Sequence, residues 1–542
     1  MLEIKNTIVK KIVILLCSVL FVFACQNNYW NEHFQAKSDE NKDDLMTILS
    51  NIPELSEFCK VVKETGYNTL LASSQTYTVW APDNQAMSGY IIDENAKQEF
   101  LNNHIARFIH NTTDVGISPN LRVQMLNGKY LVFDKTDGNY TFGGAKMETP
   151  SHPASNGLLH IINSRIPFRE NIWETLRNSN STDSIARYLT SLDQIVFQQE
   201  NSTPIGTNEF GQTVYDSVFF NYNTWQMKYG YLQMEDSIYT MLLPTNTAWI
   251  DAKTRILPYY KTFGNMLTET GTGVNVTRTF ETSGFLADSL QESYSLQNLT
   301  KDLVFSDIWD VIPTDSLVST SGNVFYNPGY IFENTIKTNA SNGLVYITNE
   351  LMYSPVSSWH KPIVVEAEYP PGRLFDYATI NQRSTLETQY KDSVSGYYFL
   401  EARNTSTSSI TQPYVSFEIP NTLAAKYNIY CVFAPPRAFD PAAALDSTKV
   451  QFLLTYIHAD GTMKEDAAIS KNPETGLDFI TNSDCMTKFP VAKNFVFPYA
   501  NVSSNQIVTV RLRVRTNVAN NETLVFTKRM RIDCLILEPV NE

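Results

Sequence analysis

The chain has 542 residues, of which 18% are charged, and a formal net charge of −14. This length predicts about three to four domains, each long enough to bury its own hydrophobic core. An acidic chain without basic clusters argues against binding to nucleic acid and against electrostatic attachment to anionic lipid. Contact with a membrane therefore requires an anchor.

The N-terminus has the pattern of a secretory signal peptide. Three lysines, Lys5, Lys10 and Lys11, precede an apolar run that ends at residue 24. This run is shorter than the roughly 20 apolar residues that a membrane-spanning helix needs. The following Cys25 resembles the lipidated cysteine of bacterial lipoproteins, which becomes the first residue of the mature chain. We expect residues 1–24 to be a lipoprotein signal peptide and Cys25 to carry acyl chains such as palmitate; the alternative is an ordinary signal peptide and a chance cysteine.

Residues 25–44 are polar and charged and are expected to form a lipidated tether, because they cannot bury enough apolar area to fold alone. Acidic residues follow the cysteine within this tether and resemble the surface-export signals of Bacteroidota-type lipoproteins. The resemblance implies a protein anchored by lipid in the cell outer membrane and exposed on the cell surface. A periplasm-facing protein is the alternative.

Two phrases occur twice in the chain and in the same order, which favours two copies of one domain. The opening phrase reads YTVWAPDNQAM at residues 77–87 and YTMLLPTNTAW at residues 239–249, and the closing phrase reads SNGLLHIINSRI at residues 155–166 and SNGLVYITNELM at residues 341–352. In the opening phrase, a β-favouring run should end at the proline. Asp83 or Asn84 can then cap a following helix.

These phrases resemble those that open and close the fasciclin domain. The matching residues of the first copy are Thr78, Val79, Ala81, Pro82, Asn84, Ala86, Asn156, Gly157, His160 and Ile162. The second copy departs further, because Tyr346 replaces the histidine and its middle is longer. The resemblance implies two α+β fasciclin-like domains, at residues 45–168 and 169–356, and a role in adhesion or matrix binding. The aromatic-rich insertion at residues 201–230 is expected either to pack on its own domain or to bind a sugar or partner.

Residues 360–542 read as short β runs separated by turn residues, which predicts an all-β sandwich. The alternation is clearest in VTVRLRVR, where Leu512 and Val514 should face inward and Arg513 outward. The expected strands are residues 363–369, 396–400, 414–419, 427–433, 450–457, 507–515, 523–527 and 530–537.

The first and last of these strands resemble those of jelly-roll, galactose-binding-like modules of carbohydrate-binding proteins. They read VVEAE at residues 364–368 and RMRIDCLILEP at residues 529–539. In many such modules, carboxylates from these two strands hold a structural calcium, which here implies Glu366, Glu368 and Asp533 as ligands. The alternative is that these carboxylates simply face outward from their strands.

Tyrosines of the same region are candidates for an aromatic platform that binds saccharide. They are Tyr377, Tyr397 and Tyr398, with Phe399 beside them. The alternative is that these rings are buried, because strands also use aromatic residues in their cores.

The sequence lacks the usual catalytic and cofactor motifs: it has no H-E-x-x-H, G-x-S-x-G, Walker A or G-x-G-x-x-G pattern. His104 and His160 lie in apolar runs and are expected to be buried and hydrogen-bonded rather than catalytic. Cys431 and Cys534 are expected to be buried apolar residues, with a disulfide among Cys431, Cys485 and Cys534 left open.

These features favour a lipoprotein that binds a glycan, matrix or protein ligand without catalysis and without a cofactor beyond a structural calcium. One alternative is an accessory subunit of an outer-membrane polysaccharide-uptake complex that includes a TonB-dependent porin. The other is an enzyme that acts on polysaccharide and uses the sandwich for targeting, because a pair of catalytic carboxylates cannot be located from sequence.

Overall fold

The computed structural model describes residues 42–89, 93, 96–117, 120–136, 138–369, 371–405, 410–502 and 507–540. The expected signal peptide, the lipidation site Cys25 and most of the tether lie outside these residues. The chain forms two compact units: the first runs to Thr175 and includes Tyr231–Ile238 and Asn339–Leu344, and the second contains the rest. Within the described ranges, no helix is long and apolar enough to cross a membrane.

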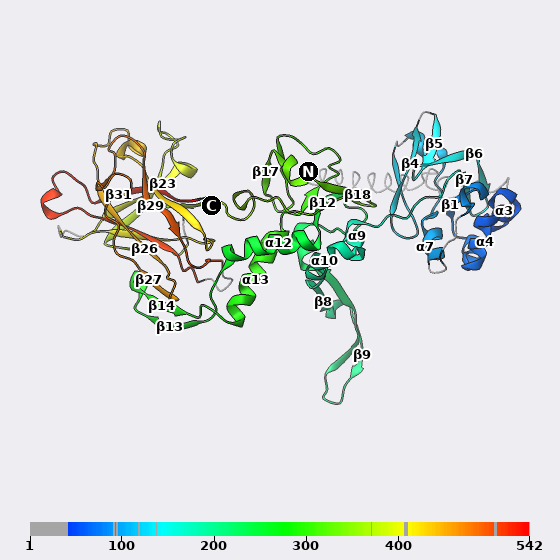
Figure 1. Ribbon diagram of the computed structural model, residues 1–542, viewed down its shortest axis with the longest axis horizontal. Helices are drawn as coiled ribbons and strands as arrows, with labels where there is room; N and C mark the ends of the chain where they lie inside the picture. Colours follow the sequence, from blue (N-terminus) through cyan, green and yellow to red (C-terminus); the bar gives the residue numbers. More distant parts are fainter. Residues whose placement is uncertain are drawn as a thin grey trace, which may run out of the picture. The chain divides into compact units, whose positions relative to one another are not determined.

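A β-sheet with the strand order β2-β1-β7-β6-β5-β4-β3 forms the centre of the first unit (Figure 1). The strands are β1 (Tyr77–Pro82), β2 (Ile105–Arg107), β3 (Leu121–Gln124), β4 (Tyr130–Thr136), β5 (Asn139–Phe142), β6 (Ala145–Ala154) and β7 (Gly157–Ile162). The opening phrase forms β1 and the closing phrase forms β7. These two strands pair in parallel along their whole length, so the repeated phrases are neighbours in one sheet.

Strand β1 is buried on both faces, as its continuous apolar run requires. On one face, Val79 packs with the helices in one core cluster. On the other face, the Trp80 ring stacks on Phe142 with 3.7 Å between ring centroids. The helices are α3 (Leu45–Asn51), η1 (Pro53–Leu55), α4 (Ser56–Glu64), α5 (Tyr67–Leu71), α6 (Asn84–Met87), α7 (Lys97–Asn102) and α8 (Thr112–Ile117).

The turn after β1 assigns separate roles to the two residues that could cap a helix. The Asp83 carboxylate accepts the Ala86 N–H at 2.6 Å and so caps α6. The Asn84 amide instead binds a neighbouring helix, because its oxygen accepts the Glu57 N–H at 3.0 Å and its nitrogen donates to the Pro53 carbonyl at 2.9 Å. The proline-asparagine phrase therefore ends the strand and fastens the helix that follows to α4.

The second pair of phrases also forms two neighbouring strands of one sheet, which has the order β15-β12-β19-β18. The opening phrase is β12 (Tyr239–Pro244), the closing phrase is β19 (Gly343–Thr348), and the flanking strands are β15 (Val304–Ser306) and β18 (Thr335–Ala340). Its turn is also repeated: Thr245 caps α12 (Asn246–Ile256). Asn246 accepts the Ser184 N–H at 2.8 Å and donates to the Asn180 carbonyl at 2.9 Å.

The remaining elements of this region are mostly short. They are α9 (Ile172–Asn178), η3 (Asn180–Thr182), α10 (Asp183–Thr190), η4 (Gln199–Asn201), α11 (Thr224–Tyr229), η5 (Leu257–Tyr260), η6 (Gly273–Asn275), α13 (Phe285–Thr300), β16 (Ser316–Val318), β17 (Val324–Tyr326), η7 (Pro328–Phe332) and η8 (Pro355–Ser357). Strand β16 pairs with β17.

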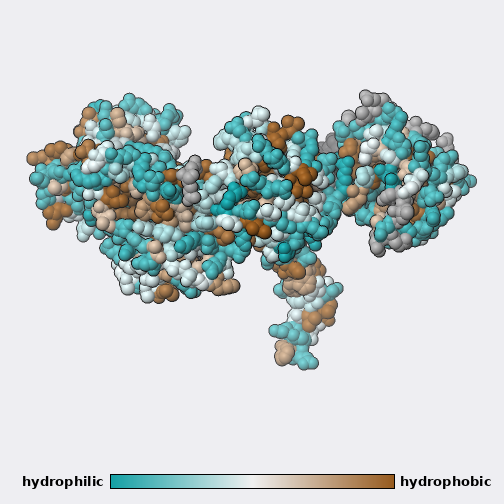
Figure 2. Space-filling model, viewed as in Figure 1, coloured by the Kyte–Doolittle hydropathy of each residue, from teal (hydrophilic) through white to brown (hydrophobic). Residues whose placement is uncertain are grey.

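The aromatic-rich insertion extends from the second unit as an arm (Figure 1). The arm consists of β8 (Asp193–Phe197) paired with β11 (Phe219–Asn223) and of β9 (Thr203–Thr207) paired with β10 (Thr213–Asp216). Phe219 and Phe220 are 57% and 50% exposed, and the arm carries brown, hydrophobic patches in Figure 2. Trp225 and Tyr229, in the helix that follows, are buried. The insertion thus divides into an exposed hairpin and a packed helix.

The C-terminal region of the second unit forms two sheets, ordered β22-β23-β31-β25-β29, with β20 on β31, and β13-β14-β27-β26-β30-β24-β21, with β28 on β26. The strands are β13 (Met266–Thr270), β14 (Thr277–Phe280), β20 (Ile363–Glu366), β21 (Leu374–Asp376), β22 (Ala378–Ser384), β23 (Tyr398–Asn404), β24 (Tyr414–Glu418), β25 (Lys426–Phe433), β26 (Lys449–Ile457), β27 (Thr462–Glu465), β28 (Phe479–Ile480), β29 (Thr487–Val496), β30 (Arg511–Thr516) and β31 (Arg529–Pro539), with the short helices η9 (Ser395–Tyr397), η10 (Pro436–Ala438) and η11 (Asn520–Glu522). Strands β13 and β14 come from residues 169–356, so the two regions expected as separate domains share a sheet.

Several expectations for this region need correction. Strand β20 ends at Glu366, β23 begins at Tyr398 after a short helix, and β30 begins at Arg511, so the expected strands 363–369, 396–400 and 507–515 have other bounds. Residues 523–527, expected as a strand, form a turn after η11 with one isolated bridge at Phe526, because the N–H groups of Val525 and Phe526 both donate to the Glu522 carbonyl at 2.9 Å. Arg513, expected to face water, is buried and forms an ion pair with Glu465. Leu512 and Val514 are buried as the alternation predicts.

Candidate functional site

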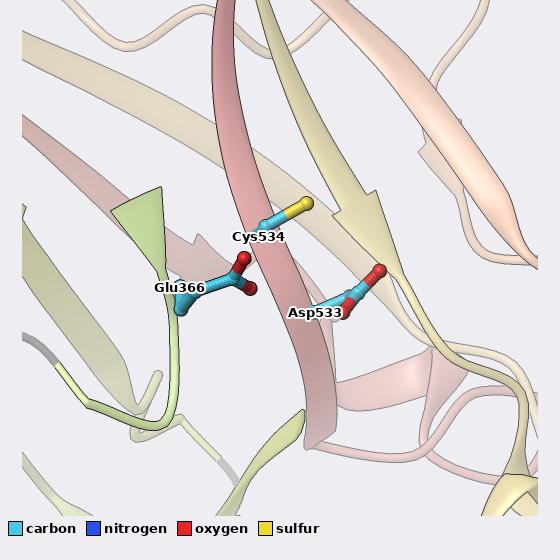
Figure 3. Close-up of side chains that lie close together, drawn as sticks. All are labelled: Glu366, Asp533 and Cys534. Carbon is cyan, nitrogen blue, oxygen red and sulfur yellow. The ribbon is translucent and has the colours of Figure 1, made fainter. Parts of the chain in front are cut away.

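A cluster of acidic side chains joins the first and last strands of the sandwich. Glu366 lies on β20, and Asp533 and Cys534 lie on the adjacent strand β31 (Figure 3). One possible ligand atom from each of these residues lies within 4.8 Å of those of the other two. The structure therefore brings together two of the carboxylates that the sequence resemblance implies, and it adds a cysteine.

A β-bulge explains how neighbouring residues of one strand reach the same site. Side chains of consecutive strand residues normally point to opposite faces. In the pairing of β25 with β31, Cys431 lies opposite Leu535 and Phe433 lies opposite Ile532. The pair Asp533–Cys534 therefore stands opposite the single residue Val432. Such bulges redirect side chains and are common next to functional sites.

The electrostatics of the cluster are those of carboxylates forced together. Burial, with Glu366 and Glu368 as neighbouring charges, raises the pKa of Asp533 to about 7. Burial and the Glu366 charge also raise the pKa of Glu368. The Oε2 atoms of Glu366 and Glu368 are buried and have no hydrogen-bond partner among the described residues. Buried carboxylate oxygens without a partner are costly, so a cation would stabilise this arrangement.

Hydrogen bonds orient two of the carboxylates. The Ser395 hydroxyl donates to Glu366 Oε1 at 2.5 Å, and the Ser395 N–H donates to Asp533 Oδ1 at 3.1 Å. Burial beside Asp533 raises the pKa of the Cys534 thiol, which favours the protonated form. Hard carboxylate oxygens suit calcium and a protonated thiol does not. Glu366 and Asp533 are thus the carboxylates that the structure brings together for such an ion, and calcium would neutralise their charge and tie β20 to β31. Glu368, the third carboxylate that the resemblance implies, acts on Asp533 through its charge.

The tyrosines proposed as a platform do not lie together. Strands β22 and β23 are antiparallel, with Ala378 opposite Asn404 and Ser384 opposite Tyr398. Tyr377 therefore stands at one end of this hairpin, and Tyr397 and Tyr398 stand at the other end, roughly 20 Å away for strands of this length.

The individual rings also differ in exposure. Tyr377 is 54% exposed and Tyr397 is 46% exposed, whereas Tyr398 is only partly exposed and Phe399 is fully buried. Phe399 packs in a small core cluster with Tyr390 and Val394, so it cannot contribute to a binding surface.

The histidines of the first domain are held by hydrogen bonds within its core. His104 donates from Nδ1 to the Phe100 carbonyl at 2.7 Å and accepts the Ile166 N–H at Nε2 at 3.2 Å. His160 donates from Nε2 to the His110 carbonyl at 2.9 Å, and Ser151 donates to its Nδ1 at 2.8 Å. Both ring nitrogens of each residue are therefore used, which leaves no lone pair for a metal or a substrate.

Tyr346 takes the place of His160 in the second copy and makes an equivalent hydrogen bond to a backbone carbonyl. Its hydroxyl donates to the Trp309 carbonyl at 2.7 Å. The neighbouring contacts repeat as well: the Thr78 hydroxyl donates to Phe108 and accepts the His110 N–H, and the Thr240 hydroxyl donates to Asp307 and accepts the Trp309 N–H. Trp309 thus occupies the place of His110, and the two copies keep one hydrogen-bond pattern despite the change of residue.

Acidification should destabilise the first domain through these histidines. Burial lowers the pKa of His104 and His160 to about 4, below the value of about 6.5 in an unfolded chain. The unfolded state then binds more protons, so the stabilisation is complete above pH 6.5 and is lost as the pH falls toward 4. Between pH 7 and pH 5 the expected loss is about 2 kcal/mol per histidine.

Native-state hydrogen exchange of the β1 and β7 amides would measure this loss in the first domain alone. The variant His160→Tyr introduces the residue of the second copy. It should keep the bond to the His110 carbonyl and reduce the pH dependence by the contribution of one histidine. An unchanged pH dependence in this variant would contradict the prediction.

Comparison with known proteins agrees with this description of the first domain. A family model, the fasciclin domain, matches residues 53–167. Mouse Stabilin-2 is 30% identical over 159 residues, which is 27% of this chain, but the chain spans only 6% of the length of that relative.

The solved structures to which the chain is similar include a fasciclin domain pair and a carbohydrate-binding module. A fasciclin domain pair from the insect cell adhesion molecule fasciclin I has 13% identity and a TM-score of 0.21, with 56% of this chain and 98% of that chain covered. A family 35 carbohydrate-binding module from Clostridium thermocellum has 8% identity and a TM-score of 0.18, with 33% of this chain and 99% of that chain covered. On the match of the family model and the elements of the structure, the chain contains an N-terminal α+β fasciclin domain, at residues 53–167, followed by a β-rich region.

Proposed function

We propose that the protein is a lipoprotein of the outer membrane, anchored through Cys25, which binds a glycan or matrix ligand and catalyses no reaction. The observation that carries this proposal is the fasciclin domain at residues 53–167, because the family's modules generally serve adhesion or matrix binding. Its histidines are committed to hydrogen bonds within the core, which supports a structural and not a chemical role for them.

In this proposal, residues 169–356 form a second fasciclin-like domain. The matching strand order and the repeated contacts of the proline-asparagine turn support this assignment. The C-terminal sandwich forms the glycan-binding module, with a calcium held by Glu366, Glu368 and Asp533. The Oε2 atoms of Glu366 and Glu368 have no hydrogen-bond partner in the part of the chain that the structure describes, which supports the calcium.

A glycan array combined with hydrolysis assays on the same polysaccharides tests the proposed function. We expect the mature protein to bind at least one polysaccharide and to release no reducing sugar from it. Release of reducing sugar that is lost on mutation of a carboxylate pair would show an enzyme. Co-purification with a TonB-dependent porin would instead indicate a subunit of a polysaccharide-uptake complex.

Metabolic labelling with palmitate tests the anchor. The wild-type protein should incorporate the label and fractionate with the outer membrane, and Cys25→Ala should lose both properties, because stable attachment requires several acyl chains. Cys485→Ala is a suitable control, since Cys485 is an exposed free thiol of the folded chain. Labelling that survives Cys25→Ala would contradict the anchor.

A further inference from the structure

One sheet of the sandwich carries a basic patch on the face away from its core. Arg383, Arg403 and Arg529, on the neighbouring strands β22, β23 and β31, surround the carboxylate of Glu401. The guanidinium of Arg383 donates to Glu401 Oε1 at 2.8 Å, Arg403 Nε lies 3.5 Å from the same oxygen, and Arg529 lies 4.0 Å from Oε2. One carboxylate thus faces several guanidinium groups, which leaves the patch positively charged.

The charge of the patch is unusual for this molecule, whose formal net charge is −14. Arg531, on the same strand as Arg529, has a carboxylate of its own. Both of its terminal nitrogens approach the Asp446 carboxylate, at 2.7 and 3.4 Å. Around Glu401 the match is incomplete, and partly buried positive charge without a counter-ion is unfavourable.

Two donors of the patch also lack acceptors among the described residues. Asn381 Nδ2 and Arg383 Nε are buried and have no hydrogen-bond partner within the part of the chain that the structure describes. Asn381 lies directly opposite Glu401 in the pairing of β22 with β23. Buried donors without a partner are rare in folded proteins and often mark the place of an ion, a water molecule or a ligand. A ligand with negatively charged oxygens beside Arg403 and Arg529 would compensate the positive charge of the patch.

A cavity of about 300 Å³ opens at the edge of the patch. Its walls are formed by Thr379, Arg403, Asn404, Thr527, Lys528 and Arg529. Guanidinium groups bind carboxylate and sulfate oxygens through paired hydrogen bonds, whereas hydroxyl and amide groups suit the hydroxyls of a sugar. The volume is at the lower end of the range for small-molecule sites, which suits one sugar residue better than an extended chain.

We propose that Arg383, Arg403 and Arg529 form a subsite for the carboxylate or sulfate group of an acidic glycan. This inference rests on the proposed function and narrows its ligand class to anionic saccharides. The cavity holds the sugar ring that carries the charged group, and Glu401 fixes the arginines in place. Arg403 and Arg529 make the direct contacts, because they line the cavity, while Arg383 completes the positive field.

Polysaccharides that share one backbone and differ in charge provide the test. The whole chain is titrated with dextran, carboxymethyl-dextran and dextran sulfate at low ionic strength, together with inorganic sulfate. We expect carboxymethyl-dextran or dextran sulfate to bind and dextran to bind far more weakly; the preferred polymer distinguishes a carboxylate from a sulfate ligand. Arg403→Gln and Arg529→Gln should each weaken binding by about tenfold or more, since a charge-assisted hydrogen bond is lost.

Two further variants separate specific contacts from charge. Lys488→Gln removes one positive charge from the same sheet, at a side chain with the same 44% exposure as Arg403, and should change the affinity by less than about twofold. Arg403→Lys keeps the charge but loses the fork of donors, so its affinity should lie between those of the wild type and Arg403→Gln.

The outcomes are distinguishable. Equal losses in Arg403→Gln and Lys488→Gln, or no loss in the arginine variants, would overturn the subsite. Binding of neutral glycans alone would overturn the subsite and leave the proposed function intact. Stabilisation by inorganic sulfate that depends on Arg403, without binding of any polysaccharide, would support the anion site and count against glycan binding as the function.

Discussion

Without calcium, Asp533 should make the C-terminal sandwich less stable as the pH rises from about 4 to about 7, and Asp533→Asn should remove this contribution. The pKa of Asp533 is raised to about 7 by burial and by the neighbouring Glu366 and Glu368 charges. The folded state therefore binds more protons than the unfolded state in this window. The stabilisation is complete below the unfolded pKa of about 4 and is lost as the pH passes the folded pKa, with a total of the order of 4 kcal/mol.

Calcium should restore the lost stability above pH 7, because it binds the ionised carboxylates of the folded state and not the unfolded chain. At a concentration one hundred times its dissociation constant, a ligand of this kind stabilises by about 2.7 kcal/mol. Calorimetry at pH 7.5 in EDTA and in excess calcium measures the difference. The wild-type sandwich should melt at a higher temperature with calcium, and Asp533→Asn should respond much less.

Glu538→Gln is the matched control for Asp533→Asn, because Glu538 is an exposed carboxylate on the same strand β31, paired with Lys488. It should keep both the pH dependence and the calcium response of the wild type, since exposed ion pairs contribute little. The assignment of the calcium site would be wrong if Asp533→Asn retained both properties. Loss of the pH dependence with an unchanged calcium response would place the ion elsewhere.

Asn156→Ala and Asn342→Ala should each destabilise the first unit by about 3 kcal/mol or more. Asn156 accepts the Leu45 N–H at 2.8 Å and donates to the carbonyls of Leu71 and Ser73 at 2.8 and 2.6 Å. Asn156 is buried, with only 5% of its surface exposed. Alanine would leave three backbone groups without partners in a site that water cannot easily enter.

Asn342 makes the same set of contacts in the second copy. It accepts the Ile172 N–H at 2.9 Å and donates to the carbonyls of Leu232 and Met234 at 2.8 and 3.0 Å. Urea denaturation compares both variants with Asn221→Ala, which removes an exposed amide from the arm and should cost less than about 0.5 kcal/mol. A large cost for Asn156→Ala with almost none for Asn342→Ala would argue against a second domain built like the first.

Several features of the fold could be predicted from local sequence. The opening phrase predicts a strand that ends at Pro82 and a capped helix, and the structure confirms both. The phrases do not predict that β1 pairs with β7. Because both phrases occur twice in the same order, they do indicate that the opening and closing phrases belong to one domain. Local rules suffice here because a proline, a capping side chain and a buried apolar run each act over a few residues.

The candidate sites could not be predicted from local sequence, because they depend on contacts between residues that are far apart in the chain. Alternation places Asp533 and Cys534 on opposite faces of a strand, and only the bulge opposite Val432 brings them together. The sequence likewise suggests Tyr377 and Tyr397 as parts of one aromatic platform, but the antiparallel register of β22 and β23 places them at opposite ends of the hairpin.

By itself, the sequence determined that the chain has a fasciclin domain near its N-terminus and a β-rich C-terminal region, because each motif and each alternation is encoded within a short segment. Only the tertiary structure decided that β13 and β14 join the sheet of the C-terminal region and that Arg383, Arg403 and Arg529 meet around one glutamate. These arrangements depend on the register between strands that are far apart in the chain, and a shift of one residue would turn each side chain to the other face.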